Sequence, residues 1–272
     1  MPRAIQPPGT EAGADFIQSI ARGLAVIRAL GTRDDGLTIA ETAQAAGLTR
    51  AGARRILLTL ARLGYVGFDD RRYQLTPRIL DLGHAYFASR PIWRVAAPVL
   101  KSLATTINET VSAGVLDGTD VLYVLRYNSA RPLHLGLAPG ARLPAHASSM
   151  GWVLLSGLSE IELAGFFRRA TLDRLTPRTV SDEAALRAHI AKAARARYAY
   201  QNGTVEEGIA GLSAPLRDGA GRIVAALNIS TNIRRASAKR AIATMLPQLQ
   251  AAAAQIETAL KAGLSHATPT SP

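Results

Sequence analysis

The sequence predicts an α+β fold in two parts, an N-terminal winged helix–turn–helix and a larger α/β domain, with a linker helix between them. Three observations support this prediction. Near the N-terminus, two helical segments, a glycine turn, a basic helix and a hairpin follow one another. A Thr-Pro pair then opens a further helix. The rest of the chain mixes helical stretches with strand pairs, and 272 residues suffice for two domains.

The first segment, residues 15–31, predicts an amphipathic helix. Asp15 is a suitable N-cap, and Gly31 ends the helical pattern. Its apolar positions recur with a helical period, and we expect them to face the core: Ile17, Ile20, Leu24, Ile27 and Leu30.

The next two helices form the helix–turn–helix pair. Thr38 is a good N-cap, and Glu41 three residues later completes a capping box. Gly47 ends this helix, and Thr49 caps the next one, residues 50–63. The stretch "YVGFDDRRYQL" then alternates around a polar tip, which predicts a β-hairpin.

The linker helix begins at Thr76 and Pro77, with the threonine as N-cap and the proline at the first helical position. Arg90-Pro91 marks the boundary to the second domain. The expected divisions are a flexible tail 1–14, the winged helix–turn–helix 15–76, the linker helix 77–90, the α/β domain 91–262 and a flexible tail 263–272.

The second domain predicts an antiparallel sheet flanked by helices, an arrangement that often holds a small-molecule pocket. Helices are expected at 92–108, from 148, at 181–198 and at 237–261. Strands are expected as a hairpin around Asp117-Gly118, a third strand at 132–140, and a second hairpin around "RDGAG".

Charge and composition limit the function classes. The formal net charge is +12, and nearly all basic residues are arginine, which suits phosphate and carboxylate partners. Nucleic acid is the first candidate, although an arginine-rich chain also results from a GC-rich genome. The chain has no cysteine, which excludes disulfides and thiolate sites. Without a long apolar run or an apolar signal core, we expect a cytoplasmic protein that does not enter a membrane.

The helix at residues 50–63 has two contrasting faces. A helical wheel places one set on the apolar side: Ala53, Ile56, Leu60 and Leu63. It places another set on the opposite side: Arg50, Arg54, Arg55 and Arg62. The second helix of a helix–turn–helix enters the DNA major groove with its N-terminal residues first. Leu58 lies among the arginines and fits neither face.

Double-stranded DNA is therefore the expected partner of this face. Arginines at the hairpin tip suit the neighbouring minor groove or backbone. The predicted DNA contacts are Arg22, Thr38, Thr49, Arg50, Arg54, Arg55, Arg71 and Arg72. Across residues 45–78 only Asp69 and Asp70 oppose this charge. A solvated basic face without a partner is the alternative.

Several segments carry a family resemblance. "FIQSIARGLAVIRAL", "LTIAETAQAAGLTRAGARRILLTLARLGYV" and "YQLTPRILDLGHAYFAS" closely resemble the DNA-binding domain and linker helix of IclR-type transcriptional regulators. "LPAHASSMGWVLLSGL", "LTPRTVSDEAALRAHI" and "GRIVAALNIST" resemble the effector domain of that family. The resemblance spans residues 16–261 and is strongest to the PcaR/PcaU/PobR branch, which regulates the breakdown of aromatic acids.

The resemblance implies a GAF-like α/β effector-binding domain and a ligand-responsive regulator. Expected partners are operator DNA, a small organic-acid effector, further copies of the chain as a homodimer or homotetramer, and RNA polymerase. It implies no cofactor and no metal. Whether the protein activates or represses transcription differs among family members.

The resemblance also assigns an effector pocket. Its candidate residues are His146, Ser148, Ser149, Met150, Gln201, Asn202, Asn228 and Ser230. To these we add Arg126 and His134, which do not come from the resemblance, as candidate partners of a ligand carboxylate. Asn228 and Ser230 share one face of a strand by the period of two. Structural roles are the alternatives: the two serines as helix caps, Asn228 as a sheet contact, Arg126 on an exposed edge, and His134 and Met150 as packing residues.

One departure from the branch concerns the ligand. Asn202 and Thr204 stand where the branch usually has Asp and Glu. Loss of two negative charges favours a more anionic ligand, with Arg126 or His134 as its partner. The candidate ligands are terephthalate, β-ketoadipate, protocatechuate and 4-hydroxybenzoate.

An enzymatic second domain is the less favoured alternative. The five histidines show no metal-ligand spacing. Ser213 lies in "GLSAP", which is not a nucleophile elbow. Glu206 and Glu207 are adjacent, so on a strand they would point to opposite faces. A constitutive DNA-binding protein without a ligand is a second alternative.

Overall fold

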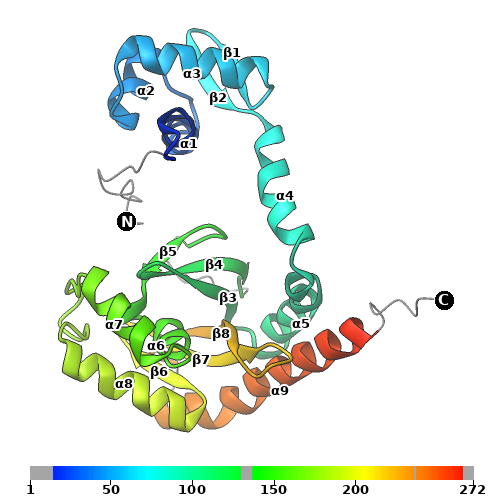
Figure 1. Ribbon diagram of the computed structural model, residues 1–272. Coiled ribbons are helices and arrows are strands. Elements are labelled where there is room, and N and C mark those ends of the chain that lie inside the picture. Colours follow the sequence, from blue (N-terminus) through cyan, green and yellow to red (C-terminus); the bar gives the residue numbers. More distant parts are fainter. Residues whose placement is uncertain (1–14, 130–136, 236, 266–272) are drawn as a thin grey trace. The chain divides into compact units, whose positions relative to one another are not determined.

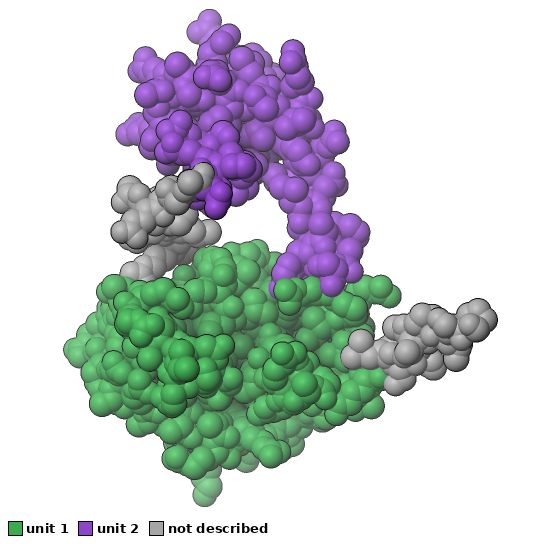
Figure 2. Space-filling model, viewed as in Figure 1, with its two compact units in different colours: residues 1–3, 90–272 green, residues 4–89 purple. Residues whose placement is uncertain are grey.

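The computed structural model describes residues 15–129, 137–235 and 237–265, which form two compact units with their boundary between Ser89 and Arg90 (Figure 2). Each unit has a hydrophobic core of its own. The predicted tail 1–14, and the end of the chain from residue 266, lie outside the described residues. Of the helices that are described, none is long and apolar enough to cross a membrane.

The first unit has the predicted winged helix–turn–helix (Figure 1). Its elements are α1 (Gln18–Leu30), α2 (Ile39–Ala46), α3 (Arg50–Arg62), β1 (Val66–Asp69) and β2 (Arg72–Leu75). Thr38 and Glu41 make both halves of the predicted capping box. Gly47 turns the chain in the left-handed region at φ +65°. The Thr49 hydroxyl then caps α3 by accepting a hydrogen bond from the Gly52 amide at 3.1 Å.

The start and the apolar face of α1 differ from the prediction. Ile17, not Asp15, occupies the N-cap position, and its side chain makes no cap. Ile17, Ile20 and Leu24 are 60%, 59% and 46% exposed. The prediction is confirmed for Leu30, which is in the core, and for Ile27, which packs against it, while Val26 and Ala29 supply the rest of the buried face. Two apolar stripes lie side by side on α1, and the helical period alone does not say which one the chain covers.

The wing is the β1–β2 hairpin. Its two tip residues, Asp70 and Arg71, have φ of +38° and +64°, as in the tight turns that match the twist of paired strands. Thr76 holds the N-cap position beyond β2, but its hydroxyl donates to the Gly64 carbonyl and not to a helix amide. A single 3₁₀ turn, Pro77–Ile79, therefore precedes α4 (Leu80–Ala88).

The second unit is built on a six-stranded antiparallel sheet with the order β5-β4-β3-β8-β7-β6 (Figure 1). Its strands are β3 (Thr110–Asp117), β4 (Asp120–Tyr127), β5 (Arg142–Pro144), β6 (Ala199–Asn202), β7 (Ile209–Arg217) and β8 (Ile223–Asn232). Its helices are α5 (Pro91–Ile107), η2 (Ala145–Ala147), α6 (Ser149–Leu155), α7 (Glu160–Arg169), α8 (Glu183–Ala196) and α9 (Ala238–Ser265). The predicted antiparallel sheet flanked by helices, and both predicted hairpins, are confirmed.

Helices cover both faces of this sheet. α5 and α9 pack together on one face, and α6, with α7 and α8 outside it, packs on the other (Figure 1). The central strands supply alternate residues to each side: Ala226 joins the core beneath α6, and its neighbours Leu227 and Ile229 face the opposite layer. Polar residues placed on the α6 side of the central strands therefore become buried.

Three segments of the second unit differ from the prediction. The expected third strand at 132–140 falls partly outside the described residues, and its described part is not a strand; β5 begins two residues later. Helix α7 follows a second capping box, Ser159 with Glu162, which sequence analysis overlooked. Glu206 and Glu207 lie in a turn between β6 and β7, so the argument that places them on a strand is wrong.

Candidate nucleic-acid interface and ligand pocket

The exposed face of α3 presents arginines. Arg50, Arg54 and Arg55 are exposed, and within the described part of the chain none of their guanidinium groups has an ion pair or hydrogen bond. The opposite face of the helix packs into the core through Ala53, Leu57 and Leu60. Leu63 was predicted for this face, but it is 52% exposed because α3 ends before it. Leu57, which was not predicted for this face, is buried. Leu58 is exposed as well.

The N-terminal end of α3 borders a groove shared with α1. Arg22 from α1 and Thr49 and Arg55 from the start of α3 line this groove. The Thr49 hydroxyl oxygen accepts a hydrogen bond from the Gly52 amide, and the hydroxyl proton remains available to donate. The Thr38 hydroxyl oxygen likewise accepts the Glu41 amide in the capping box, so only its proton is left to donate. Backbone amides and arginines at a helix N-terminus are suited to phosphate.

The two arginines of the wing differ from each other. Arg71 is exposed at the tip, with no partner among the residues that the structure describes. Arg72 donates to the Gly36 carbonyl at 2.9 Å and lies 3.4 Å from carboxylate oxygens of both Asp35 and Glu41. The prediction that the charge of residues 45–78 is locally unpaired is therefore wrong for Arg72, whose partners precede that segment, and for Arg78, whose Nε lies 3.9 Å from the Asp81 carboxylate beyond it. Arg72 fastens the wing to the start of α2.

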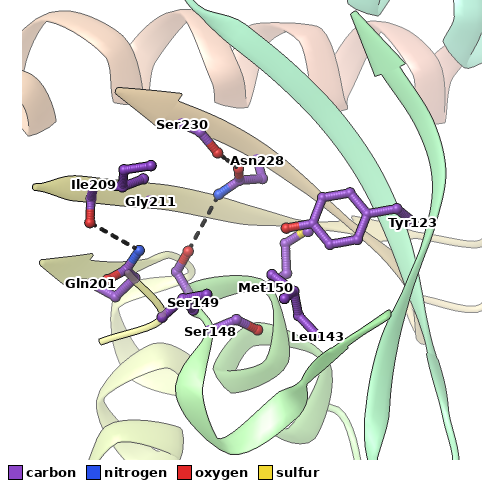
Figure 3. Close-up of a pocket in the computed structure, with 11 residues that line it drawn as sticks. Tyr123, Leu143, Ser148, Ser149, Met150, Gln201, Ile209, Gly211, Asn228 and Ser230 are labelled. Atoms are coloured by element: carbon purple, nitrogen blue, oxygen red, sulfur yellow. Dashed lines mark hydrogen bonds between the residues drawn. The ribbon is translucent and has the colours of Figure 1, made fainter. Parts of the chain in front are cut away.

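A small polar pocket lies between the sheet and the N-terminal end of α6 (Figure 3). Its walls are formed by Tyr123, Leu143, Ser148, Ser149, Met150, Gln201, Val205, Ile209, Gly211, Asn228 and Ser230. The space between atoms is about 320 Å³ including its mouth, at the low end for a small-molecule site. The free space inside it is on the order of a single water molecule. A single-ring ligand therefore needs side chains to move here.

Hydrogen bonds fix the central polar groups of this pocket. The Asn228 side-chain amide donates to the Ser213 hydroxyl at 3.0 Å and lies 3.3 Å from that of Ser149 (Figure 3). The Ser230 hydroxyl donates to the Asn228 side-chain oxygen at 2.7 Å. The Ser149 and Ser213 hydroxyls are 2.9 Å apart. Asn228 therefore contacts α6 as well as the sheet, and Ser148, not Ser149, caps α6.

Gln201 forms the wall next to the β6–β7 turn. Its side-chain oxygen accepts from the Thr204 amide at 3.0 Å, and its side-chain amide is directed toward the Ile209 carbonyl at 3.5 Å (Figure 3). The Thr204 hydroxyl lies 2.5 Å from the Ala147 carbonyl, beside the start of α6. Thr204 therefore closes the turn onto η2 and does not line the pocket.

Tyr123 lines the other end of the pocket, and Arg126 lies three residues further along β4, outside the wall. The β3–β4 register shifts between Ala113 and Gly114, so Gly114 pairs with Tyr123 while Ser112 pairs with Arg126. Paired residues share a face of the sheet, which places both β4 side chains on the α6 side. The Tyr123 hydroxyl points into the pocket (Figure 3). One terminal nitrogen of Arg126 is buried without a hydrogen-bond partner among the described residues.

The electrostatics at this end favour an anion. Burial raises the pKa of Tyr123 to about 12, so its phenol is a neutral hydrogen-bond donor. Burial lowers the pKa of Arg126, although the group stays cationic at neutral pH. Its Nε donates to the Asn128 side chain at 3.1 Å, which holds the guanidinium in place. A carboxylate here would satisfy donors that have no acceptor.

The remaining predicted pocket residues have other surroundings. His146 is 1% exposed, and its Nε2 lies 3.0 Å from the Asp173 carbonyl, outside the pocket wall. Asn202 is one residue from Gln201 on β6 and so faces the other side of the sheet. His134 falls outside the described residues. Neither Asn202 nor Thr204 lines the pocket, so the loss of two negative charges at these positions does not act directly on the ligand.

Five of the eleven residues that line the pocket were not predicted from the sequence. The missed residues are Tyr123, Leu143, Val205, Ile209 and Gly211. Gly211 had a local signal, a glycine inside a strand pattern, which often marks a close approach. The others are apolar or aromatic residues whose side of the sheet depends on strand register. Among the described residues, no group of three His, Asp or Glu side chains is placed to hold a metal ion.

Family models match both units of the chain. The model described as the IclR helix-turn-helix domain matches residues 19–70, and the model described as the bacterial transcriptional regulator IclR C-terminal matches residues 84–258. The second match alone covers more than half of the chain.

Curated relatives match nearly the full length. The Pca regulon regulatory protein of Pseudomonas putida is 37% identical over 88% of this chain and 82% of its own length. The p-hydroxybenzoate hydroxylase transcriptional activator of Acinetobacter baylyi is 32% identical over 87% of this chain and 89% of its own.

Solved structures share the fold. A protein from Rhodococcus sp. RHA1, described as a transcriptional regulator, is 40% identical with a TM-score of 0.81, and the match covers 91% of this chain and 99% of that one. An IclR homologue from Microbacterium hydrocarbonoxydans, solved in complex with 4-hydroxybenzoate, is 26% identical with a TM-score of 0.80 over 90% and 99% of the two chains.

Proposed function

The chain belongs to the IclR family of bacterial transcriptional regulators, and on that premise we propose that it regulates genes for aromatic-acid breakdown in response to a small aromatic carboxylate. The observation behind the ligand class is that the Tyr123 hydroxyl in the wall of a compact polar pocket and a partnerless guanidinium nitrogen of Arg126 lie on the same face of the sheet. Relatives named for the Pca regulon and for p-hydroxybenzoate hydroxylase support the same class.

The DNA-reading element is α3. Arg50 and Arg54 lie one helical turn apart at its exposed N-terminal end, which in this motif enters the major groove. Arg22 and Arg55 flank the α1–α3 groove, where a phosphate of the DNA backbone fits. Arg71 at the wing tip reaches an adjacent groove or backbone, whereas Arg72 acts mainly by holding the wing.

The effector is a single-ring acid. The aromatic ring contacts Met150 and Leu143, and the carboxylate accepts from Tyr123 and Arg126. Gln201 and the Ser149–Asn228 group remain to bind a hydroxyl at the far end of the ring. Arg126 is the one cation among the described residues that line the pocket or lie on β3 and β4. This favours 4-hydroxybenzoate or protocatechuate over the dicarboxylates terephthalate and β-ketoadipate.

Self-association accompanies DNA binding in this proposal. The exposed stripe of α1 (Phe16, Ile17, Ile20 and Leu24) is an apolar surface that a second copy of the chain would cover. Paired copies place two α3 helices on two half-sites of an operator. The ligand then acts by linkage: it favours one arrangement of the paired copies, and operator affinity changes by the difference in binding energy, typically about 1–3 kcal/mol.

The test is DNA binding by the full-length protein with and without ligand. Fluorescence anisotropy on the intergenic DNA upstream of its own gene measures operator affinity in the presence of each of the four acids. We expect specific binding, with affinity changed about fivefold or more by a monocarboxylate. Specific binding unaffected by any acid supports a constitutive regulator instead. A larger response to a dicarboxylate contradicts the assignment of Arg126 as the sole cationic partner.

A further inference from the structure

A second cavity lies at the free edge of the sheet, away from the effector pocket. It is lined by Trp152, His189, Lys192, Ala193, Ala196, Tyr198, Ala199, Tyr200, Ala238 and Ile242. β6 is an edge strand, so α8 on one face of the sheet and the first turns of α9 on the other overhang it. The cavity contains about 650 Å³ between atoms including its mouth, twice the effector pocket.

Small side chains create this space. Ala193 and Ala196 from α8, Ala199 from β6 and Ala238 from α9 all line it. Larger residues at these places would bring the helices into contact with β6, as in a close-packed core. The alanines therefore leave a hollow between elements that otherwise pack normally.

Aromatic rings form much of the remaining wall. Trp152 stacks on His189 with ring centroids 4.2 Å apart and an interplanar angle of 23°. The Trp152 indole N–H donates to the His146 carbonyl at 2.7 Å, so the ring is fixed. Tyr198, just before β6, and Tyr200, on it, also line the cavity. Flat apolar walls of this kind suit an aromatic ligand.

The polar groups around the cavity are donors. Lys192 lies one turn from His189 on the same face of α8, and no carboxylate is among the lining residues. Within the described part of the chain, the Lys192 amine and the two tyrosine hydroxyls have no hydrogen-bond partner. Burial, and secondly the charge of Lys192, lower the pKa of His189, so its imidazole is neutral at pH 7 and contributes ring surface and not charge.

We propose that this cavity is a second ligand site, which binds a small aromatic carboxylate with its ring against the Trp152–His189 stack and its carboxylate on Lys192. The site is separate from the effector pocket, because the two cavities share no lining residue. They are connected through α6, which presents Met150 to one and Trp152 to the other. A ligand in either cavity restrains the same helix.

Fluorine NMR and proton NMR of the full-length protein test this proposal with 4-fluorobenzoate as the probe. The imidazole resonance of His189, assigned with a His189→Gln variant, reports on the second cavity directly. We expect the probe to shift this resonance, because a ring added to the stack changes its ring-current field. Ala196→Phe fills the cavity and should remove the shift, whereas Ala194→Phe, at an exposed position of the same helix, should retain it.

A charge comparison completes the test. Lys192→Gln should weaken the His189-linked binding roughly two- to fivefold, as expected for loss of one solvent-exposed ion pair. Lys239→Gln removes the same charge from an exposed position on α9 that does not line the cavity, and should leave binding unchanged. If saturating probe leaves His189 of the unmodified protein unshifted, the proposal is wrong whatever happens in the effector pocket. It is equally wrong if Ala196→Phe binds as the unmodified protein does.

Discussion

Tyr123 and Arg126 project from the same face of the sheet although they are three residues apart on one strand. In a regular strand an odd separation puts side chains on opposite faces. The shift in β3–β4 pairing beside Val124 adds one residue to β4 and cancels that alternation. As a result, a neutral phenol that lines the pocket and a guanidinium with one buried, partnerless nitrogen lie on the same face of the sheet.

Replacing Arg126 by Met should separate ligand binding from stability. The stem is kept and the charge is lost, so we expect affinity for 4-hydroxybenzoate to fall about 10- to 100-fold. The ligand-free protein should become more stable by about 1 kcal/mol, because a buried donor without a partner is removed. Calorimetric titration and urea unfolding measure the two effects. Arg168→Met, at an exposed position on α7, is the control; equal affinities for the two variants would place the carboxylate elsewhere.

Tyr123 should make stability depend on alkaline pH. Its pKa in the folded chain, about 12, lies above the ordinary value of 10.0, so folding favours the neutral phenol. That contribution is complete below pH 10 and is lost as pH rises through 12, because the unfolded chain ionises first. Between these limits the free energy of unfolding should fall by about 1–3 kcal/mol more in the unmodified protein than in Tyr123→Phe. Urea unfolding of both proteins across this range decides it, and identical pH slopes would mean that Tyr123 is not the buried phenol.

Gly211 should be irreplaceable in the pocket but not in the fold at large. A Cβ added there would lie 2.8 Å from the Ser149 hydroxyl and 3.2 Å from side-chain nitrogens of both Asn228 and Gln201. Gly211→Ala should therefore displace these groups, weaken effector binding about tenfold or more and reduce stability by about 1–3 kcal/mol. Gly219→Ala, in the open β7–β8 turn, meets nothing within 4 Å and should change neither. Normal ligand affinity in Gly211→Ala would show that these three groups do not bind it.

The sequence predicts the DNA-binding unit well because its signals are local. Thr38 with Glu41, Gly47 and Thr49 each act within one helical turn of their partners, so the pattern of letters contains the contact. The same locality explains the prediction of Ser148 or Ser149 as a cap.

The pocket is harder to predict from the sequence than the DNA-binding unit, because its geometry depends on pairing between distant segments. Nothing in "VLYVLRYN" indicates the β4 bulge that brings Tyr123 to the side of Arg126. The partners of Arg72, at residues 35, 36 and 41, likewise become visible only once the wing is folded against α2. Register and tertiary ion pairs are therefore the features that sequence patterns leave undetermined.

Arg54→Ala tests the recognition surface. Arg54 is exposed near the start of α3 and supports no other described residue, so its loss should not affect folding. We expect operator affinity to fall by about 1–3 kcal/mol if the guanidinium contacts a base, with relaxed sequence preference at that position. Effector affinity should be unchanged. Arg62→Ala, at the exposed C-terminal end of the same helix, should have a smaller effect. Unaltered anisotropy titrations for Arg54→Ala would mean that this face is only solvated.

Ile20→Glu tests whether the apolar stripe of α1 joins two copies of the chain. Ile20 is 59% exposed and lies one helical turn before Leu24, so a charge there costs little in the isolated unit but would be desolvated in an interface. Sedimentation velocity should show loss of the larger species, and operator affinity should fall with it because two half-sites are no longer bound together. Ile161→Glu makes the same change at an 84% exposed position on α7 and should alter neither measurement. If Ile20→Glu self-associates as the unmodified protein does, another surface joins the copies, and the α1 stripe does not bind a second copy of the chain.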